Sequence, residues 1–399
     1  MRRIRALGEI GALEGGGVCR LALSDEDKAG RDLVVRWMRE LGLDVTVDRI
    51  GNVIGVRAGA VQGPPVMTGS HIDTVATGGL YDGNLGVLAG LEVIETLNEA
   101  GITTHHPLAV GFFTNEEGAR FAPDMMGSGV HQGALSLEEC LATVDSDGVS
   151  VGEHLERIGY AGNVAADSVR ARAFVELHVE QGPVLEKENI VIGAVTGVQG
   201  ISWTQYTVTG TSNHAGTTPM NLRHDAGYVA AAIATGARRI AREMGGDQVA
   251  TSGVIELAPN LVNVIACRAR VTVDLRNTDE QALQRAEQSM ADEVAMLTER
   301  EGVAIEARTL ARFAPVEFDR EMVDRVADTA EALGHSVKRM PSGAGHDAQM
   351  FAPNCPAAMI FVPSKDGISH NVHEYTAPGE IRAGADVLLQ VLLSLAGSE

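Results

Sequence analysis

Strand-like and helix-like segments alternate through most of the chain, and this alternation restricts the fold more than any other feature. The pattern predicts strands at 44–50, 52–59, 65–70, 106–115, 172–180 and 357–363, and helices at 25–41, 86–101, 321–334 and 384–397. Ser24 reads as the N-cap of the first of these helices. Apolar strands that alternate with helices favour a mostly parallel sheet with helical crossovers. We therefore predict an α/β fold for this part of the chain.

The rhythm changes in the middle of the sequence. Strands are expected at 202–210, 251–257, 267–277 and 302–310, and helices at 225–245 and 278–300. This βαββαβ order is that of a self-contained ferredoxin-like α+β unit. A chain of 399 residues is also too long for one ordinary core. We predict a catalytic domain made of residues 1–204 and 314–399, with a second domain inserted at 205–313.

Charge and cysteine content exclude several classes of protein. The formal net charge of −21 argues against nucleic acid or an anionic membrane as a partner. The four cysteines have no paired spacing, so neither a disulfide framework nor a thiolate zinc site is indicated. No apolar run of about 18 residues occurs, and the first residues lack a continuous apolar segment. We expect a cytoplasmic protein that neither is secreted nor spans a membrane.

Polar clusters follow four of the predicted strands: "SHIDT" with "YDGN", "FFTNEEGARF", "ELHVEQGP" and "DGISHNVHEYT". In open α/β folds the ends of strands are where sites are built. Each cluster alone is more typical of a polar turn or of a hydrogen-bonded histidine than of a metal ligand. Together they supply several imidazoles and carboxylates that would be costly to bury unpaired, whereas two metal ions would use them all. Imidazole and carboxylate without thiolate favour a hydrolytic site over a structural one.

These motifs resemble those of the hydantoinase/carbamoylase family of amidohydrolases, within the larger superfamily of two-metal aminoacylases and carboxypeptidases. The resemblance rests on "GSHIDTVATGGLYDGNLGVLAG", "FTNEEGARF", "ELHVEQGPVLE", "GTSNHAGTTPM", "NLVNVIACRARVTVDLR", "PSGAGHDAQMFA" and "GISHNVHEYT", in this order from about residue 15 to the C-terminus. It implies a di-metal catalytic domain and an inserted domain that serves as lid and dimerisation module.

The resemblance also implies a set of metal ligands and a general base. The expected ligands are His71 and His178 for one ion, Glu117 and His370 for the other, and Asp82 as the bridge. Glu116 corresponds to the base. Asp73, two residues after His71, is expected to hold that imidazole in place, with a turn-capping role as the alternative. His105, His106, His131, His346 and His373 lack the motif context of a ligand.

The remaining candidates concern the substrate. The resemblance makes Arg276 and Asn263 the clamp for a substrate carboxylate, and makes His214 a donor to the oxyanion that reaches across a homodimer interface. An arginine fork suits a carboxylate because it donates two parallel hydrogen bonds. Further substrate contacts are expected from Gln199, Arg223, Gly343 and Ala344.

The function that the resemblance implies is hydrolysis of the ureido group of an N-carbamoyl-L-amino acid, yielding the L-amino acid, carbon dioxide and ammonia. Two divalent ions per chain are expected, Zn²⁺ or Mn²⁺, with Co²⁺ or Ni²⁺ also compatible with these ligands. Allantoate amidohydrolase and then ureidopropionase are the alternatives within the family. A dipeptidase or aminoacylase and a non-catalytic binding protein are alternatives outside it.

Overall fold

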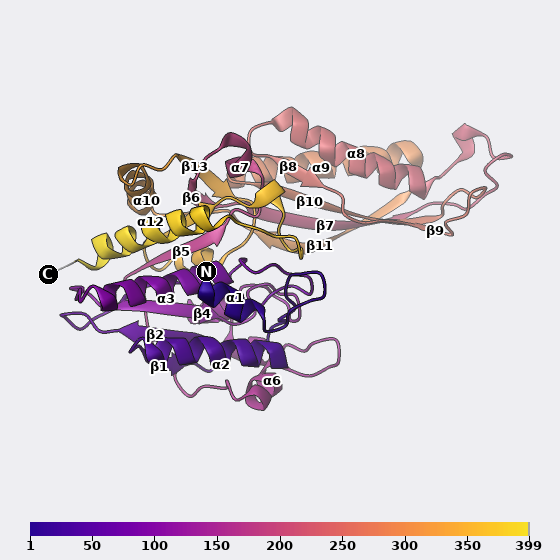
Figure 1. Ribbon diagram of the computed structural model, residues 1–399. Helices are drawn as coiled ribbons and strands as arrows, with labels where there is room; N and C mark the ends of the chain where they lie inside the picture. Colours follow the sequence, from indigo (N-terminus) through magenta and orange to yellow (C-terminus); the bar gives the residue numbers. More distant parts are fainter. Residues whose placement is uncertain (398–399) are drawn as a thin grey trace. The chain divides into compact units, whose positions relative to one another are not determined.

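The structure, a computed structural model, describes residues 1–397, and these form two compact units (Figure 1). The first unit contains residues 1–197 and the chain from 317 onward, and the second contains Val198–Val316. The boundary at residue 205 that we expected falls inside strand β7 (Gly200–Thr209), all of which belongs to the second unit. A hydrogen-bonded strand stays within one sheet, so the change of unit comes before it.

The first unit is built on a nine-stranded sheet with the order β1-β2-β4-β3-β5-β14-β6-β12, in which β13 also pairs with β6. The strands are β1 (Asp44–Val47), β2 (Val53–Arg57), β3 (Val66–His71), β4 (Leu108–Phe113), β5 (Ala173–Val179), β6 (Ile192–Val198), β12 (Val316–Glu317), β13 (Val337–Ser342) and β14 (Ala357–Val362). The four central strands, β4, β3, β5 and β14, run parallel. The outer pairs β1–β2, β2–β4 and β14–β6 are antiparallel. The predicted α/β class with a mainly parallel centre is confirmed.

Helices cover both faces of this sheet. They are α1 (Arg2–Gly8), α2 (Asp25–Glu40), α3 (Asn84–Glu99), α4 (Met126–His131), α5 (Leu137–Ala142), α6 (Val151–Ile158), α7 (Val184–Glu188), α10 (Arg320–Ala332), α11 (Asp347–Phe351) and α12 (Pro378–Ala396), with a 3₁₀ turn at Lys365–Gly367. On β5 the side chain of Leu177 lies against α12, which packs beside α3, whereas Glu176 accepts the main-chain N–H of Ala348 in α11. Adjacent strand residues point to opposite faces, so these helices lie on opposite sides of the sheet.

Burial on both faces explains the composition of the central strands. Every residue of β3, β4, β5 and β14 is buried, and most are apolar, as expected for parallel strands with two covered faces. The predicted N-cap of α2 is confirmed, because the Ser24 hydroxyl accepts the main-chain N–H of Asp27 at 3.1 Å. None of the helices in residues 1–397 is long and apolar enough to cross a membrane.

The second unit is an antiparallel sheet with the order β11-β7-β10-β8, in which β9 also pairs with β10. Its elements after β7 are a 3₁₀ turn (Met220–Leu222), α8 (Ala226–Met244), β8 (Val249–Thr251), β9 (Ile255–Ala258), β10 (Arg268–Asn277), α9 (Glu280–Glu301) and β11 (Ala304–Phe313). Helices α8 and α9 pack on one face over a core that includes Val208, Val229, Ile233, Val271 and Leu283. The opposite face of β10 carries alternating polar side chains, which gives the period-two pattern of a sheet covered on one side.

The single strand expected at 251–257 is instead two short strands. Thr251 pairs with Asp274 and Ile255 pairs with Val271, so residues 252–254 lie opposite only 272–273. One extra residue in the edge strand is a β-bulge. The main-chain N–H of Val254 donates to the Thr272 hydroxyl at 3.2 Å, which stabilises the bulge.

Candidate metal centre and active site

Side chains from the carboxyl ends of the parallel strands converge in the first unit. His71 is the last residue of β3, and His178 is the penultimate residue of β5. Glu116 and Glu117 follow β4, and His370 follows β14. These four strands are neighbours and run in the same direction, so their ends meet at one edge of the sheet. This is the edge at which open α/β sheets bind ligands.

Asp82 lies between two groups of candidate ligands. Its Oδ1 is 3.5 Å from Nε2 of His71 and 3.2 Å from Nε2 of His178. Its Oδ2 is 3.3 Å from Nε2 of His370, which is in turn 3.2 Å from Oε2 of Glu117. In each group the ligand atoms lie within 4.8 Å of one another. The five side chains therefore form two three-residue groups that share one carboxylate.

The donor set fits two divalent ions. Nδ1 of His71 contacts the carbonyl oxygen of Asp73 at 2.9 Å, and Nδ1 of His178 contacts that of Val179 at the same distance. These contacts orient both rings so that Nε2 faces a carboxylate oxygen of Asp82. A nitrogen lone pair and a carboxylate oxygen at this separation need a cation between them, which is either a proton or a metal ion. Imidazole and carboxylate ligands held in this way suit Zn²⁺ and Mn²⁺.

Close approach of the main chain to His71 requires a glycine at position 83. Gly83 precedes α3 and has φ of +64°, and a Cβ atom there would collide with the imidazole ring of His71. Only glycine adopts this backbone without strain and also leaves room for the ring. The "YDGN" turn therefore places Asp82 beside both histidines.

Asp73, which was expected to hold His71 in place, contacts that imidazole with its main chain and not with its carboxylate. Its carbonyl oxygen makes that contact, and its carboxylate accepts the main-chain N–H groups of Glu116 and Glu117, both at 3.3 Å. The chain turns after His71, so the carboxylate faces the loop that follows β4 and not the imidazole. Asp73 thus connects the histidine segment to the two glutamates.

Burial and charge determine the protonation of the cluster. Burial raises the pKa of Glu116 well above its usual range, against the opposing effect of His71. Burial would also raise the pKa of Asp82, but hydrogen bonds from the three histidines hold it well below its usual range. Burial lowers the pKa of His71, but Glu116 and Asp82 reverse this and raise it well above its usual range. Asp82 and Glu117 raise the pKa of the more exposed His370 to about 10.

A cavity of about 110 Å³ opens at this cluster. Besides the five candidate ligands and Glu116 it is lined by Asp124, Gln181, Ala344, Gly345 and His346. Of these, Ala344, Gly345 and His346 belong to the "SGAGH" stretch from which further substrate contacts were expected. Gln181 was missed, although it lies in the "HVEQGP" motif, and its amide donates to Asp82 Oδ2 at 2.8 Å.

A third possible ligand group, formed by Glu176, His178 and His346, is already used within the protein. Glu176 accepts the Ser70 hydroxyl at 2.6 Å and the Ala348 N–H at 2.8 Å. Nε2 of His346 lies 2.9 Å from the Ser342 hydroxyl. The oxygens of Glu176 are therefore occupied by hydrogen bonds within the protein.

Apart from Gly343, which follows β13 in the first unit, the other residues expected to bind substrate belong to the second unit. Three of them lie in or beside two neighbouring loops. The main-chain N–H of Ala215 donates to the carbonyl of Asn263 at 3.0 Å, which joins the His214 loop to the Asn263 loop. His214 is exposed, and its Nδ1 accepts the N–H of Gly216 at 3.1 Å. The guanidinium of Arg223 donates to the carbonyls of Thr218 and Ala215, so it shapes the His214 loop.

Arg276 and Gln199 lie elsewhere in the second unit. Arg276, near the end of β10, pairs with Asp274 at 2.9 Å, and its guanidinium carbon lies over the ring of Trp203, 5.8 Å from the ring centroid. Gln199 sits at the junction of β6 and β7. Asp274 and Arg276 are two residues apart on one strand, so they share a face of the sheet.

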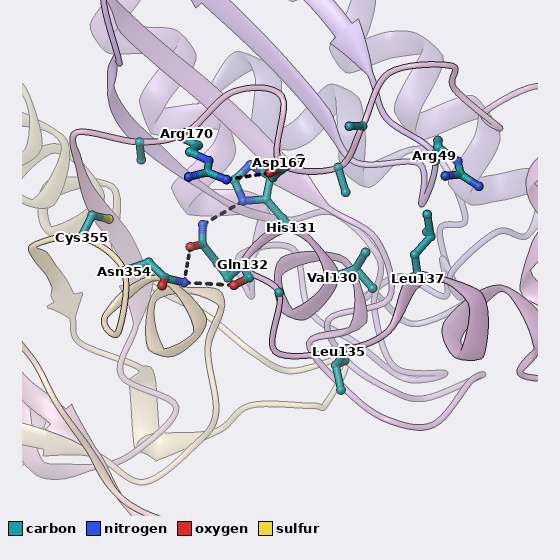
Figure 2. Close-up of a pocket in the computed structure, with 14 residues that line it drawn as sticks. Arg49, Val130, His131, Gln132, Leu135, Leu137, Asp167, Arg170, Asn354 and Cys355 are labelled. Carbon is teal, nitrogen blue, oxygen red and sulfur yellow. Dashed lines mark hydrogen bonds and ion pairs between the residues drawn. The ribbon is translucent and has the colours of Figure 1, made fainter.

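A larger cavity of about 520 Å³ lies elsewhere in the first unit, beside the end of α4 (Figure 2). Figure 2 shows a hydrogen-bonded chain along it, in which Asn354 donates to Gln132 and Gln132 donates to Nδ1 of His131. Arg170 and Asp167 form an ion pair at 2.8 Å. These polar groups bond to one another, so we assign the cavity no chemistry despite its size.

Comparisons with known proteins agree with this geometry. The sequence matches peptidase family M20/M25/M40 over residues 67–394. It is 41% identical to an N-carbamoyl-L-amino-acid amidohydrolase from Rhizobium meliloti, over 98% of this chain and 94% of the relative. It is 35% identical to an allantoate amidohydrolase from Bacillus subtilis, over 98% of this chain and 96% of the relative. The crystal structure of an amidase of the hydantoinase/carbamoylase family from Burkholderia multivorans superposes with a TM-score of 0.96 at 47% identity, covering 99% of this chain and 96% of that one.

Proposed function

This chain belongs to peptidase family M20/M25/M40, and within that family we propose that it hydrolyses the ureido C–N bond of N-carbamoyl-L-amino acids with two divalent metal ions. The observation that carries the proposal is the division of Asp82 between two ligand groups, His71 with His178 and Glu117 with His370. The amidohydrolase names of full-length relatives supply the substrate class.

When bound, two ions in such a site lower the pKa of a water molecule and polarise the carbonyl that is attacked. His71, His178, Glu117 and His370 would hold them, with Asp82 between. Zn²⁺ and Mn²⁺ suit these ligands best, and Co²⁺ and Ni²⁺ are compatible with them.

Glu116 is the proposed general base. It is buried, and its Oε2 lies 3.3 Å from Nε2 of His71 without belonging to either ligand group. Its raised pKa brings it closer to the pH at which it must accept a proton from the attacking water and return that proton to the leaving nitrogen. Water adds H and OH across one ureido C–N bond, and the carbamic acid that results then loses its remaining C–N bond to release carbon dioxide, so the products are the L-amino acid, carbon dioxide and ammonia.

Substrate recognition is proposed for residues of the second unit, and for Gly343 and Ala344 of the first. Arg276 and Asn263 hold the α-carboxylate, and Gln199, Gly343 and Ala344 add contacts. His214 donates a proton or hydrogen bond to the developing oxyanion. Asp274, which pairs with the Arg276 guanidinium at 2.9 Å, would keep the fork of that side chain oriented.

A homodimer is proposed, formed through the second unit. Exposed apolar side chains gather on the two loops around His214, with Met220 78% and Val262 fully exposed. The neighbouring edge strand β9 also presents Ile255 and Leu257. Exposed apolar loops and edge strands usually find partners. A partner on this surface would place His214 at a shared site.

Among residues 1–397 all four cysteines are free, which is consistent with the cytoplasmic location that we propose.

The proposal can be tested by removing the metal ions and then restoring them. Ammonia release from an N-carbamoyl-L-amino acid should stop after treatment with a chelator and return when Mn²⁺ or Zn²⁺ is added. Activity that is unaffected by metal removal, verified by elemental analysis, would refute the two-ion mechanism. Allantoate remains the second candidate substrate, because the sequence is also 35% identical to an allantoate amidohydrolase.

A further inference from the structure

Glu374 is a buried carboxylate that the proposed reaction does not use. It lies in the loop after β14, four residues beyond His370, and is 6% exposed. Its Oε1 accepts the main-chain N–H of Tyr81 at 3.0 Å and that of Asp82 at 3.1 Å. Glu374 therefore holds the backbone of the shared carboxylate from a segment almost 300 residues away in the sequence.

The other oxygen of Glu374 reaches the same carboxylate through a hydroxyl. Ser369 Oγ lies 2.9 Å from Glu374 Oε2 and 3.1 Å from Asp82 Oδ2. Ser369 is also the residue immediately before His370. One short chain of contacts thus joins the Asp82 turn to the loop that carries the candidate ligand His370.

The main chain leaves space for this contact. A Cβ atom at Gly79 would collide with the carboxylate of Glu374, so the absence of a side chain at position 79 lets the glutamate approach the turn. The N–H groups of Tyr81 and Asp82 are buried and need an acceptor. Without Glu374 the turn would have to shift to find one.

We propose that Glu374 is a positioning residue that fixes Asp82 relative to His370 and thereby sets the separation of the two metal-ion sites. The inference rests on the proposed two-ion function. The positioning depends on the hydrogen bonds that Glu374 makes and not on its charge. A glutamine at position 374 would keep the oxygen that accepts both N–H groups, and its amide nitrogen would donate to Ser369, leaving the hydroxyl proton for Asp82.

The test compares four variants of the full-length protein after a chelator has removed metal. Titration calorimetry with Mn²⁺ gives the number and affinity of the ions, and thermal unfolding shows that each variant is folded. Glu374→Ala should weaken at least one of the two ions about 10- to 100-fold, as loss of a group that orients a ligand commonly does. Glu374→Gln should remain within about threefold of the parent, because it keeps the hydrogen bonds. Glu156→Ala, an exposed glutamate on α6, is the control and should bind like the parent.

Ser369→Ala removes the contacts with Asp82 Oδ2 and Glu374 Oε2 but keeps the two main-chain hydrogen bonds of Glu374, so it should weaken binding in the same direction, by a smaller factor. If Glu374→Ala does not fold, Ser369→Ala tests the inference in its place. Parental affinity for both ions in folded Glu374→Ala, or in Ser369→Ala, would overturn the inference. So would a Glu374→Gln variant as weak as Glu374→Ala, because charge would then matter more than geometry. A parent protein that binds fewer than two ions would instead refute the proposed function on which the inference rests.

Discussion

The carboxylate of Asp73 accepts the main-chain N–H of Glu116 at 3.3 Å, and its other oxygen accepts that of Glu117 at the same distance. The segment that carries His71 is thereby tied to the loop that carries both glutamates. The two glutamates are adjacent in sequence but face different histidines, because Glu116 lies 3.3 Å from Nε2 of His71 and Glu117 lies 3.2 Å from that of His370. Different roles follow from these positions.

Glu116→Gln should lower kcat about 10²–10⁴-fold, because it removes the proton acceptor and leaves the two ligand groups intact. Glu117→Gln should instead lower the number or affinity of bound ions, because it removes a ligand of the His370 group. Elemental analysis and steady-state kinetics on the same preparations separate the two effects. Equal loss of metal in both variants would show that the base and the ligand have been assigned wrongly.

Metal binding should release protons. The pKa values of His71 and His370 are raised, the latter to about 10, so His370 carries a proton at neutral pH unless an ion replaces it, and the shift at His71 favours a proton in the same direction. An ion requires the deprotonated ring, and its apparent affinity should therefore rise with pH. Calorimetry of Mn²⁺ binding in buffers of different ionisation enthalpy measures the protons released. A buffer-independent enthalpy would contradict this prediction.

The stability of chelator-treated protein should fall as pH rises, whereas the apparent metal affinity should rise. A histidine whose folded-state pKa is raised contributes stability that is complete below its unfolded pKa of about 6.5 and is lost as pH rises through the folded value. For His370 this window extends from about 6.5 to about 10. The His370→Asn variant should show a flatter decline of the unfolding free energy over this window. If the unfolding free energy of the variant falls with pH as steeply as that of the parent, His370 does not contribute to the pH dependence of stability.

The meeting of polar clusters at the candidate metal centre could be predicted from the sequence for a physical reason, whereas the individual ligands came from the family resemblance. His71, His178 and the two glutamates lie at or just after buried parallel strands, and the carboxyl ends of such strands meet at one edge. The spacing of His71 and Asp73 did not reveal which group of Asp73 contacts the imidazole, because that depends on a turn of the main chain. Glu374 and Gln181 escaped notice because their partners are backbone groups and a carboxylate about a hundred residues away or more.

For the second unit, the sequence predicted the helices and strands better than it predicted the contacts between residues. The βαββαβ order could be read from periodicity, but the bulge that divides β8 from β9 left no clear signal. Arg223 donates to two carbonyls of its own loop, which sequence could not show. The pairing of Arg276 with Asp274 was within reach, since residues two apart on a strand share a face.

Arg276→Ala should cost about 2 to 5 kcal/mol of substrate binding free energy if it leaves the substrate carboxylate buried without its partner. Substrates whose carboxylate is converted to an amide should be poor for the parent enzyme and should lose little further in the variant. Kinetics with matched acid and amide substrates measure both effects. Equal rates with acid and amide substrates would show that Arg276 does not bind the substrate carboxylate.

Subunit mixing tests whether His214 acts across the proposed dimer. Glu116→Gln and His214→Ala chains should each be inactive alone. A mixed dimer should regain one complete site, in which the His214→Ala chain supplies Glu116 and the other chain supplies His214. Activity should rise as subunits exchange, up to about a quarter of the parental value for random mixing of equal amounts. Demonstrated exchange without recovery would show that His214 acts within its own chain or not at all.

The most direct test of the central claim is ammonia release by one metal-loaded preparation from N-carbamoyl-L-amino acids, allantoate, 3-ureidopropionate and simple dipeptides, the last followed by amino-acid release. Glu116→Gln serves as the control for contaminating activity. We predict the highest kcat/KM for an N-carbamoyl-L-amino acid, none for its D-enantiomer, and loss of turnover in Glu116→Gln. A higher kcat/KM for a dipeptide than for any ureido substrate, or activity that Glu116→Gln retains, would contradict the account.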